Sequence, residues 1–160
     1  EILKKTNMRQ IAEFVGQYRF LSNFYTCTIT YDGIIYNSLE HYYVAMKTTD
    51  LTVRRFISGI ATAGQVKRYG RQNVVVRPDW DDVKLQVMEY GLRQKFTDPE
   101  LAKLLLSTDD AKLVEGNFWH DNFWGVCSCD KCNYTGYNYL GKLLMKVRSD
   151  LKKNINNGQD

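Results

Sequence analysis

Hydrophobic and polar positions recur with a helical period over most of the chain, and one segment near the N-terminus has the period of a strand. In that segment, residues 27–36, β-branched and aromatic residues flank Asp32-Gly33, a dipeptide typical of hairpin turns. A short strand is expected at residues 112–115 and a loop at 116–136. Helices are predicted over residues 38–48, 50–58, 61–69, 80–96, 100–106 and 138–151. We therefore expect a mainly α (α+β) fold, a compact multihelical domain with a small β-hairpin near the N-terminus.

Capping preferences suggest where several helices begin and end. Gly70 is expected to follow the third helix, because glycine readily adopts the left-handed conformation that ends many helices. Asp79 is expected to cap the long helix that starts at Trp80, with Asp82 at the second position of a capping box. Pro99 suits the first position of the helix that follows.

A single domain is the default for 160 residues of which 44% are apolar and 25% are charged. We place it at residues 14–151 and expect the polar termini, residues 1–13 and 152–160, to fray. The sequence shows no apolar run of membrane-spanning length and no apolar signal-peptide core. Three of the four cysteines crowd into residues 127–132, which is not the pattern of a secreted disulfide scaffold. We therefore expect a cytoplasmic protein.

The chain is mildly basic, with a net charge of +4 and a pI near 8.8. This charge suits a ligand that carries phosphate but is too small for a domain that coats DNA. The sequence has no Gly-rich phosphate loop, no H-E-x-x-H motif and no G-x-S-x-G motif. Common nucleotide-dependent, metalloprotease and serine-hydrolase functions are therefore not indicated.

The predicted helix at residues 38–48 carries the most informative pair of charges. Glu40 and Lys47 are seven residues apart, so they return to within roughly 20° of each other and lie about 10 Å apart along the axis. A carboxylate and an amine so placed can close on one small ligand. The alternative is two solvated charges that flank a buried helix. The apolar stripe beside them consists of Leu39, Tyr42, Tyr43 and Met46.

Cations and a tryptophan follow this helix in the sequence. Lys67, Arg68 and Arg71 surround the end of a predicted helix, where they either complement its dipole or bind phosphate. Arg71 lies just beyond a glycine and is the best placed to fork onto a phosphate. Trp80 begins the next long helix and is either a hydrophobic anchor or a wall for a flat base.

The segment from residue 117 to residue 125 places a second carboxylate, Asp121, among two Trp and two Phe residues on a loop. Packed aromatic rings would desolvate Asp121 and raise its pKa, as a general acid near neutrality requires. The alternative is an Asx-type turn whose aromatic residues fill the core. Asn138, just after this loop, is either the N-cap of the last helix or a hydrogen-bonding partner of a ligand.

His120, Cys127, Cys129 and Cys132 provide four possible zinc ligands. Their spacing differs from the paired C-x-x-C motifs of zinc ribbons and knuckles. On spacing alone we favour reduced thiols in a surface loop, and we predict neither a metal nor a cofactor. If zinc did bind, four protein ligands would leave no open position, so it would brace the loop rather than take part in catalysis.

In order along about residues 18–150, these segments resemble the NADAR/YbiA-like family of N-glycosidases. One departure is that the shorter bacterial YbiA-type pattern has a Gly-rich loop where this chain has Cys127 to Cys132. The stretches that carry the resemblance are Phe20-Leu-Ser-Asn-Phe24, Ser38-x-Glu-His-Tyr42, Ala45-x-Lys47, Gly70-Arg71, Asp79-Trp80, Val87-Met88, Lys95-Phe96, Lys112-Leu-Val-Glu115, Asp121-x-Phe-Trp-Gly125 and Asn138-x-Leu-Gly-x-Leu-Leu-Met145.

The resemblance implies a mainly helical enzyme that hydrolyses N-glycosidic bonds of ribose phosphates or ADP-ribose. The family's catalytic glutamate and lysine fall on Glu40 and Lys47, and its aromatic and acidic pocket residues fall on Trp80, Asp121 and Trp124. We predict Glu40, Lys47 and Asp121 as catalytic. The residues that we predict to bind substrate are Phe20, Ser22, Asn23, Tyr43, Arg71, Trp80, Trp124 and Asn138.

Two mechanisms fit these residues. In one, Glu40 stabilises the oxocarbenium-like centre or activates water while Asp121 protonates the departing base. In the other, which we prefer slightly, Lys47 attacks C1′ and forms a Schiff base while Glu40 transfers protons.

The expected partner is an ADP-ribosylated guanine nucleotide or nucleic acid, and the alternative is a small ribose-phosphate metabolite of the riboflavin pathway, a phosphoribosylamino-pyrimidine. Outside enzymes, the alternative is a non-catalytic module that binds ADP-ribose or nucleic acid. No membrane association and no obligate protein partner are predicted.

Overall fold

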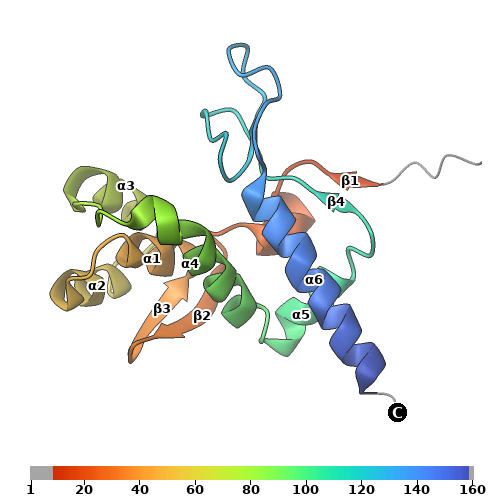
Figure 1. Cartoon of the computed structure of the whole chain (residues 1–160), viewed down its shortest axis with the longest axis horizontal. Helices are drawn as coiled ribbons and strands as arrows, with labels where there is room; N and C mark the ends of the chain where they lie inside the picture. The colour runs from red at the N-terminus through yellow and green to blue at the C-terminus, as the bar shows by residue number, and fades with distance from the viewer. Residues whose placement is uncertain (1–8, 159–160) are drawn as a thin grey trace, which may run out of the picture. The chain divides into compact units, whose positions relative to one another are not determined.

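In the computed structural model, residues 9–158 are described, and they form six α-helices, one 3-10 helix and three small two-stranded sheets. The expected mainly helical class with a β-hairpin near the N-terminus is confirmed (Figure 1). The backbone divides into two units, each described by itself below. The central unit is Arg19–Ala102, and the terminal unit consists of residues 9–18 and 103–158.

The central unit consists of a hairpin and a group of helices, and Figure 1 shows these helices beside the hairpin. The 3-10 helix η1 leads into it and α5 leaves it. The elements are η1 (Gly16–Leu21), β2 (Thr26–Tyr31), β3 (Ile34–Ser38), α1 (Leu39–Met46), α2 (Leu51–Ser58), α3 (Ala63–Asn73), α4 (Trp80–Lys95) and α5 (Pro99–Leu106).

The predicted hairpin turn is confirmed. Strands β2 and β3 pair antiparallel, with Tyr31 opposite Ile34. Between them Asp32 and Gly33 both have positive φ, 50° and 75°, as a two-residue turn that matches the twist of the strands requires. Ile29 on β2 is fully buried, so the inner face of the hairpin contributes to the core of the central unit.

Helix α1 lies at the centre of this unit and contacts α2, α3, α4 and the hairpin. Two glycines allow its neighbours to come close. A Cβ atom on Gly70 of α3 would lie 2.6 Å from Val44, and one on Gly91 of α4 would lie 2.7 Å from the Tyr42 ring. The prediction that Gly70 ends its helix is wrong, because α3 continues to Asn73 and Gly70 serves helix packing instead.

The long helix α4 begins at Trp80 with Asp79 at the N-cap position, as predicted, but the predicted capping interaction is absent. Asp79 makes no side-chain capping bond, so no capping box forms with Asp82. Both carboxylate oxygens of Asp79 instead accept hydrogen bonds from Arg77, at 2.6 and 2.9 Å. The ion pair with the neighbouring guanidinium thus replaces the capping interaction.

The terminal unit is built around the last helix. Strand β1 (Gln10–Ile11) pairs parallel with β4 (Lys112–Leu113), and β5 (Gly116–Asn117) pairs parallel with β6 (Val126–Cys127). Helix α6 (Tyr139–Asn157) contacts β4. The buried guanidinium of Arg148 on α6 donates hydrogen bonds to the Thr108 hydroxyl and the Ala111 carbonyl at 2.8 and 2.9 Å.

The structure corrects our expectation at both ends of the chain. Residues 1–8 and 159–160 lie outside the described residues. Within the N-terminal segment expected to fray, Gln10–Ile11 forms β1 and Ile11 is buried. At the other end, α6 continues to Asn157, beyond the predicted boundary at residue 151. Both ends have partners far along the chain: Ile11 pairs with Leu113, and the Lys152 ammonium donates to the Asp109 carbonyl at 2.8 Å.

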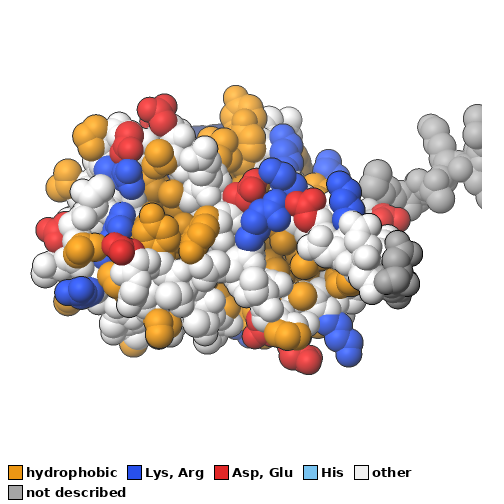
Figure 2. Space-filling view, turned by 60° about the horizontal axis from the view of Figure 1, so that its bottom comes forward, with side chains coloured by type: hydrophobic (Ala, Val, Ile, Leu, Met, Phe, Trp, Pro, Cys, Tyr) orange, Lys and Arg blue, Asp and Glu red, His pale blue; other side chains and the backbone are white. Residues whose placement is uncertain are grey.

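Within residues 9–158, no helix combines the length and the apolar character needed to cross a membrane. The surface is mixed, and Figure 2 shows hydrophobic side chains separated by charged ones on one face. Four exposed aromatic residues belong to the long loop that precedes α6, residues 117–138. They are Phe118, Trp119, Tyr134 and Tyr137.

Candidate active site

Helix α1 carries the predicted catalytic pair, and its first turn positions the carboxylate. The Ser38 hydroxyl accepts a hydrogen bond from the His41 backbone N–H, which caps the helix. The Glu40 backbone N–H donates to the Asn23 carbonyl at 3.0 Å. Glu40 is 8% exposed, so the alternative of a solvated charge on this helix is wrong for the glutamate.

His41 is a structural residue. Its Nε2 donates to the Ile60 carbonyl at 2.8 Å, because a carbonyl can only accept. Its Nδ1 therefore accepts from the Ser38 hydroxyl at 2.6 Å. Both ring nitrogens are occupied, and the imidazole connects the start of α1 to the segment after α2. The histidine therefore fixes the helix that carries Glu40 and takes no part in chemistry there.

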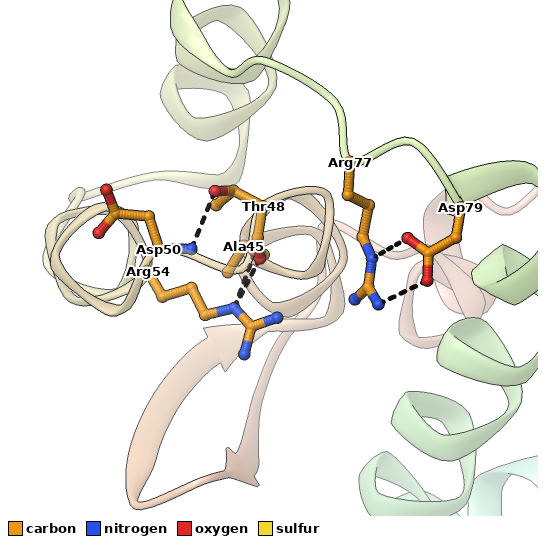
Figure 3. A network of polar contacts seen from close by, with 6 residues as sticks. All are labelled: Ala45, Thr48, Asp50, Arg54, Arg77 and Asp79. Carbon is orange, nitrogen blue, oxygen red and sulfur yellow. Dashed lines mark hydrogen bonds and ion pairs between the residues drawn. The ribbon is translucent and has the colours of Figure 1, made fainter.

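Lys47 is the C-cap of α1, and two arginines fix the backbone around it. The buried Arg54 donates from Nε to the carbonyls of Ala45 and Thr48, at 3.2 and 2.8 Å. The Arg77 backbone N–H donates to the Lys47 carbonyl at 2.7 Å. Figure 3 shows the Arg54 contact with Ala45 and the Arg77–Asp79 ion pair on either side of this helix end. Carbonyls that would be unpaired at a helix C-terminus thus have partners.

The environment of Lys47 lowers the pKa of its amine from the ordinary lysine value. Burial is the main cause, because it disfavours the charged form. The Glu40 carboxylate opposes this change, and the cations of Lys67, Arg71 and Lys84 reinforce it. The two members of the pair therefore interact electrostatically, and three further cations from α3 and α4 act on the same amine. The four cations outnumber the two acids beside them, Glu40 and the Asp81 that pairs with Lys84, so the group suits an anionic ligand.

An aromatic pair adjoins Lys47. The Lys47 ammonium lies 5.1 Å from the centroid of the Tyr43 ring. The Tyr43 ring is in turn 5.1 Å from Trp80, with an interplanar angle of 60°. Trp80 is buried, whereas Tyr43 is only partly buried. The structure thus brings Tyr43, Lys47 and Trp80 together, and both sequence interpretations of Trp80 stay compatible with this packing.

The predicted binding residues before β2 also belong to the central unit. Phe20 is buried in η1, and the Ser22 hydroxyl accepts a hydrogen bond from the Phe24 backbone N–H at 3.1 Å. The Asn23 amide nitrogen contacts the Met88 sulfur at 3.8 Å, while its Oδ1 is buried without a hydrogen-bond partner. Asn23, whose backbone carbonyl accepts from the Glu40 N–H, thus also has a buried side-chain acceptor that is a candidate hydrogen-bonding group for a ligand.

Asp121 and Trp124 belong to the terminal unit. The Asp121 Oδ1 accepts hydrogen bonds from the backbone N–H groups of Phe123 and Trp124, at 3.2 and 2.9 Å. This is the Asx-type turn that the sequence left as an alternative. The Trp124 ring packs edge-on against the Phe123 ring, with 4.7 Å between the ring centroids. The catalytic role of Asp121 and the binding role of Trp124 stay predictions.

Asn138 occupies the N-cap position of α6, but its side chain does not cap the helix. It precedes α6 with a left-handed backbone, φ 54°, and makes no side-chain capping bond. Its buried amide donates to the Leu113 carbonyl at 2.9 Å and accepts from the Glu115 backbone N–H at 3.0 Å. The N-cap interpretation therefore holds for its position in the chain but not for its side-chain contacts. The amide connects α6 to the β4 segment, and its contact with substrate stays a prediction.

Sequence reasoning missed two members of the site. Lys84 lies four residues after Trp80, so it shares a face of α4 with the tryptophan, and this spacing was the available signal. Lys84 also pairs with Asp81 at 2.9 Å. Lys67 was noted in the sequence but not predicted to bind substrate. It lies four residues before Arg71 on α3 and 5.7 Å from the Phe24 ring.

Comparison with known proteins identifies the family of this chain. A family model described as the NADAR domain matches residues 11–152. N-glycosidase YbiA of Escherichia coli (strain K12) is 39% identical over 136 residues, which cover 84% of this chain and 82% of that protein. A riboflavin biosynthesis protein of Vibrio vulnificus (strain YJ016) is 38% identical over 136 residues. That alignment covers 84% of this chain but only 36% of the Vibrio protein.

A solved structure is also similar. The NMR structure of E. coli YbiA matches with a TM-score of 0.76 and 36% sequence identity, and the match covers 92% of this chain and 88% of that one. The similarity extends across most of the described residues. It therefore supports the expected fold class independently of the local sequence patterns.

Proposed function

Because the chain belongs to the NADAR domain family, we propose that it is an N-glycosidase that hydrolyses the bond between ADP-ribose and guanine in a nucleotide or nucleic acid. The observation that carries the proposal is the pair on α1. Glu40 and Lys47 interact electrostatically, and the pKa of the lysine is lowered by burial and by three cations. An amine with a lowered pKa can act as the nucleophile that attacks an anomeric carbon, and a nearby carboxylate can transfer the protons of that reaction.

The reaction begins with a proton transfer from the Lys47 ammonium to the Glu40 carboxylate. The neutral amine attacks C1′, and the bond from C1′ to the guanine nitrogen breaks. Guanine leaves with the electron pair of that bond and takes the proton from Glu40. The glutamate then accepts the proton released by the lysine nitrogen and delivers it to the ring oxygen as the sugar opens to a Schiff base. Water, activated by Glu40, hydrolyses the Schiff base and restores Lys47.

The cations support a substrate with more than one phosphate. Lys67, Arg71 and Lys84 all act on the Lys47 amine, and they come from two different helices. Arginine forks onto phosphate oxygens, and lysine adds a compact positive charge. A diphosphate can contact several of these cations at once. This favours a substrate that contains ADP-ribose over one that carries a single phosphate. Trp80 and Tyr43 would flank the base or the ribose.

A second function is favoured by a specific comparison. The Vibrio relative is named as a riboflavin biosynthesis protein. This name favours hydrolysis of a phosphoribosylamino-pyrimidine, whose single phosphate would use fewer of the cations. The chemistry at C1′ would be the same in both cases.

One experiment distinguishes the two functions. The protein is incubated with an oligonucleotide that carries ADP-ribosylated guanine and, separately, with the phosphoribosylamino-pyrimidine, and the products are identified by mass spectrometry. We expect the oligonucleotide to lose the mass of ADP-ribose and to regain unmodified guanine. Cleavage of the pyrimidine alone would replace the first function by the second. Binding of either compound with no product would favour a non-catalytic module.

Borohydride trapping tests the covalent step. Reduction during turnover would convert the Schiff base into a stable amine, and peptide mapping would locate it on Lys47. Lys47→Ala is expected to abolish the adduct, whereas replacement of an exposed lysine on α5, Lys103→Ala, is expected to leave it unchanged. An adduct that survives Lys47→Ala would overturn the role of Lys47, and an active wild-type enzyme that gives no adduct would leave the scheme in which Glu40 activates water.

A further inference from the structure

The long loop that precedes α6 brings together one imidazole and three thiols that the proposed reaction does not use. The ligand atoms of His120, Cys127, Cys129 and Cys132 all lie within 4.8 Å of one another. The cysteines form no disulfide. The four residues span thirteen positions of the chain, and β6 supplies one of them, Cys127. The loop therefore folds back on itself to collect these groups.

The distances from the imidazole nitrogen to the three sulfurs suit a tetrahedral metal centre. The Nδ1 atom of His120 is 3.2 Å from the Cys129 sulfur, 3.5 Å from that of Cys132 and 3.9 Å from that of Cys127. For zinc with bonds of about 2.3 Å to sulfur and about 2.05 Å to nitrogen, the edges of a tetrahedron from nitrogen to sulfur are about 3.6 Å. The observed values bracket this length.

Each of the three sulfurs also has a hydrogen-bond donor. The His120 backbone N–H donates to the Cys127 sulfur at 3.3 Å, and the Cys132 backbone N–H donates to the Cys129 sulfur at 3.4 Å. The Asn122 amide donates to the Cys132 sulfur at 3.5 Å. Outer hydrogen bonds of this kind orient and stabilise metal-bound thiolates. The loop thus provides both the ligands and their supporting donors.

The backbone around the four ligands adopts conformations that need external support. His120, Asn133 and Tyr134 have positive φ values of 73°, 48° and 58°. Such conformations are uncommon outside glycine, and for a bulky residue such as Tyr134 they persist where the surroundings determine them strongly. Four bonds to one central ion would provide that constraint in a segment with only short strands.

We propose that His120, Cys127, Cys129 and Cys132 bind one structural zinc ion. Three soft thiolates and an imidazole in a tetrahedral arrangement favour zinc over magnesium, calcium or manganese. Four protein ligands leave no position for water or substrate, so the ion has no direct catalytic part. Sequence spacing alone favours reduced thiols, and the assembled geometry changes that preference.

The zinc site also supports the loop that carries Asp121. His120 immediately precedes this residue, and the Asn117 amide donates to the Asp121 carbonyl at 2.9 Å and accepts from its N–H at 3.0 Å. One side of the turn is thus fixed by a buried asparagine and the other by the metal ligand. This role does not depend on which substrate the protein cleaves.

Elemental analysis of the intact protein, purified under reducing conditions and without a metal-affinity step, tests the proposal. We expect about one zinc ion per chain, as four ligands forming one closed site require. Cys132→Ser and Cys129→Ser should each lose most of the metal. Cys27→Ser is the matched control, because Cys27 belongs to the central unit, and it should keep the full zinc content. Wild-type protein that stays zinc-free after incubation with zinc sulfate and a reductant would overturn the proposal.

Cobalt substitution keeps the test valid if a cysteine variant fails to fold. Wild-type protein in which zinc has been replaced by cobalt should show intense thiolate-to-cobalt absorption and the ligand-field bands of a tetrahedral ion. Absence of these bands in a protein that retains its helical circular dichroism would contradict the site. Zinc content and cobalt spectra do not require turnover, so failure of the proposed glycosidase activity would leave this test unaffected.

Discussion

Helix α1 and the long loop before α6 position their functional groups in different ways. On α1, the helical repeat itself places Glu40 and Lys47 on one side, and neighbouring elements supply burial and charge. Residues 117–138 form the loop, and no helical repeat sets the positions of its side chains. The position of Asp121 depends on hydrogen bonds to Asn117 and on the proposed metal ligands. The spacing of functional residues on a helix can therefore be predicted from the sequence. The arrangement of functional residues on a loop depends on tertiary contacts, which sequence spacing does not predict.

The largest expected effect is on the helical side of this comparison. Glu40→Gln removes the proton-transfer group but keeps the shape of a buried side chain, so we expect kcat to fall by about 10²–10⁴-fold. Steady-state kinetics on the cleaved substrate would measure this loss. Glu100→Gln, on the exposed first turn of α5, is the control and should leave kcat unchanged. Equal losses in both variants would show that Glu40 has no special role.

On the loop side, the expected effect is on stability. Asn117 is buried, and its amide donates to the Asp121 carbonyl and accepts from the Asp121 N–H. Asn117→Ala would leave buried polar groups without partners, and we expect it to lower the free energy of unfolding by about 2–4 kcal/mol. Chemical denaturation would measure the change. Asn73→Ala, at an exposed site, should change stability by less than about 0.5 kcal/mol.

A smaller effect is expected where α3 packs on α1. Gly70→Ala places a methyl group 2.6 Å from Val44, so we expect the free energy of unfolding to fall by about 1–3 kcal/mol. Gly64 lies on the same helix, where an added methyl group would meet no atom within 4 Å, and Gly64→Ala should stabilise by about 0.5–1 kcal/mol. Thermal unfolding of both variants would compare them. A Gly70→Ala variant as stable as Gly64→Ala would contradict the packing of α3 on α1 through Gly70.

The smallest expected effect concerns pH. The pKa of Lys47 is lowered by burial, opposed by Glu40 and lowered further by Lys67, Arg71 and Lys84. The proposed reaction starts from the Lys47 ammonium and the Glu40 carboxylate, and guanine leaves with the proton that this pair holds, so kcat/KM should fall with pH as Lys47 loses its proton in the free enzyme. Lys84→Met removes one cation, raises the pKa of Lys47 and should move this fall toward higher pH by a few tenths of a unit. A profile that moves toward lower pH would contradict the assignment.

The same pKa direction has a consequence for stability. Because the pKa of Lys47 is lower in the folded chain than in the unfolded chain, the unfolded chain binds more protons between those two pKa values. The free energy of unfolding is therefore expected to rise with pH between those two pKa values. Below both values, burial of the charged Lys47 ammonium destabilises the folded chain to its full extent. Lys47→Met would remove this contribution, which denaturation at several alkaline pH values would show.

Several features could be predicted because they depend on neighbours in the sequence. The Asp32-Gly33 turn needs two adjacent residues with positive φ, and the start of α5 needs Pro99 with the Asp98 carboxylate as its cap, and both are found. Gly70 and Asn138 could not be assigned in this way. The partner of Gly70 is Val44 and the partners of Asn138 are Leu113 and Glu115, all more than twenty residues away.

The sequence by itself determined the helical period, the hairpin and the pairing of Glu40 with Lys47 on one helix, because these follow from local backbone geometry. Only the tertiary structure decided that Glu40 is buried and that the pKa of Lys47 is lowered, because burial and charge come from distant helices. It also decided that His120 meets three thiols at distances suited to a metal. Distances between side chains on a loop are set by the fold of the whole loop and not by their spacing in the chain.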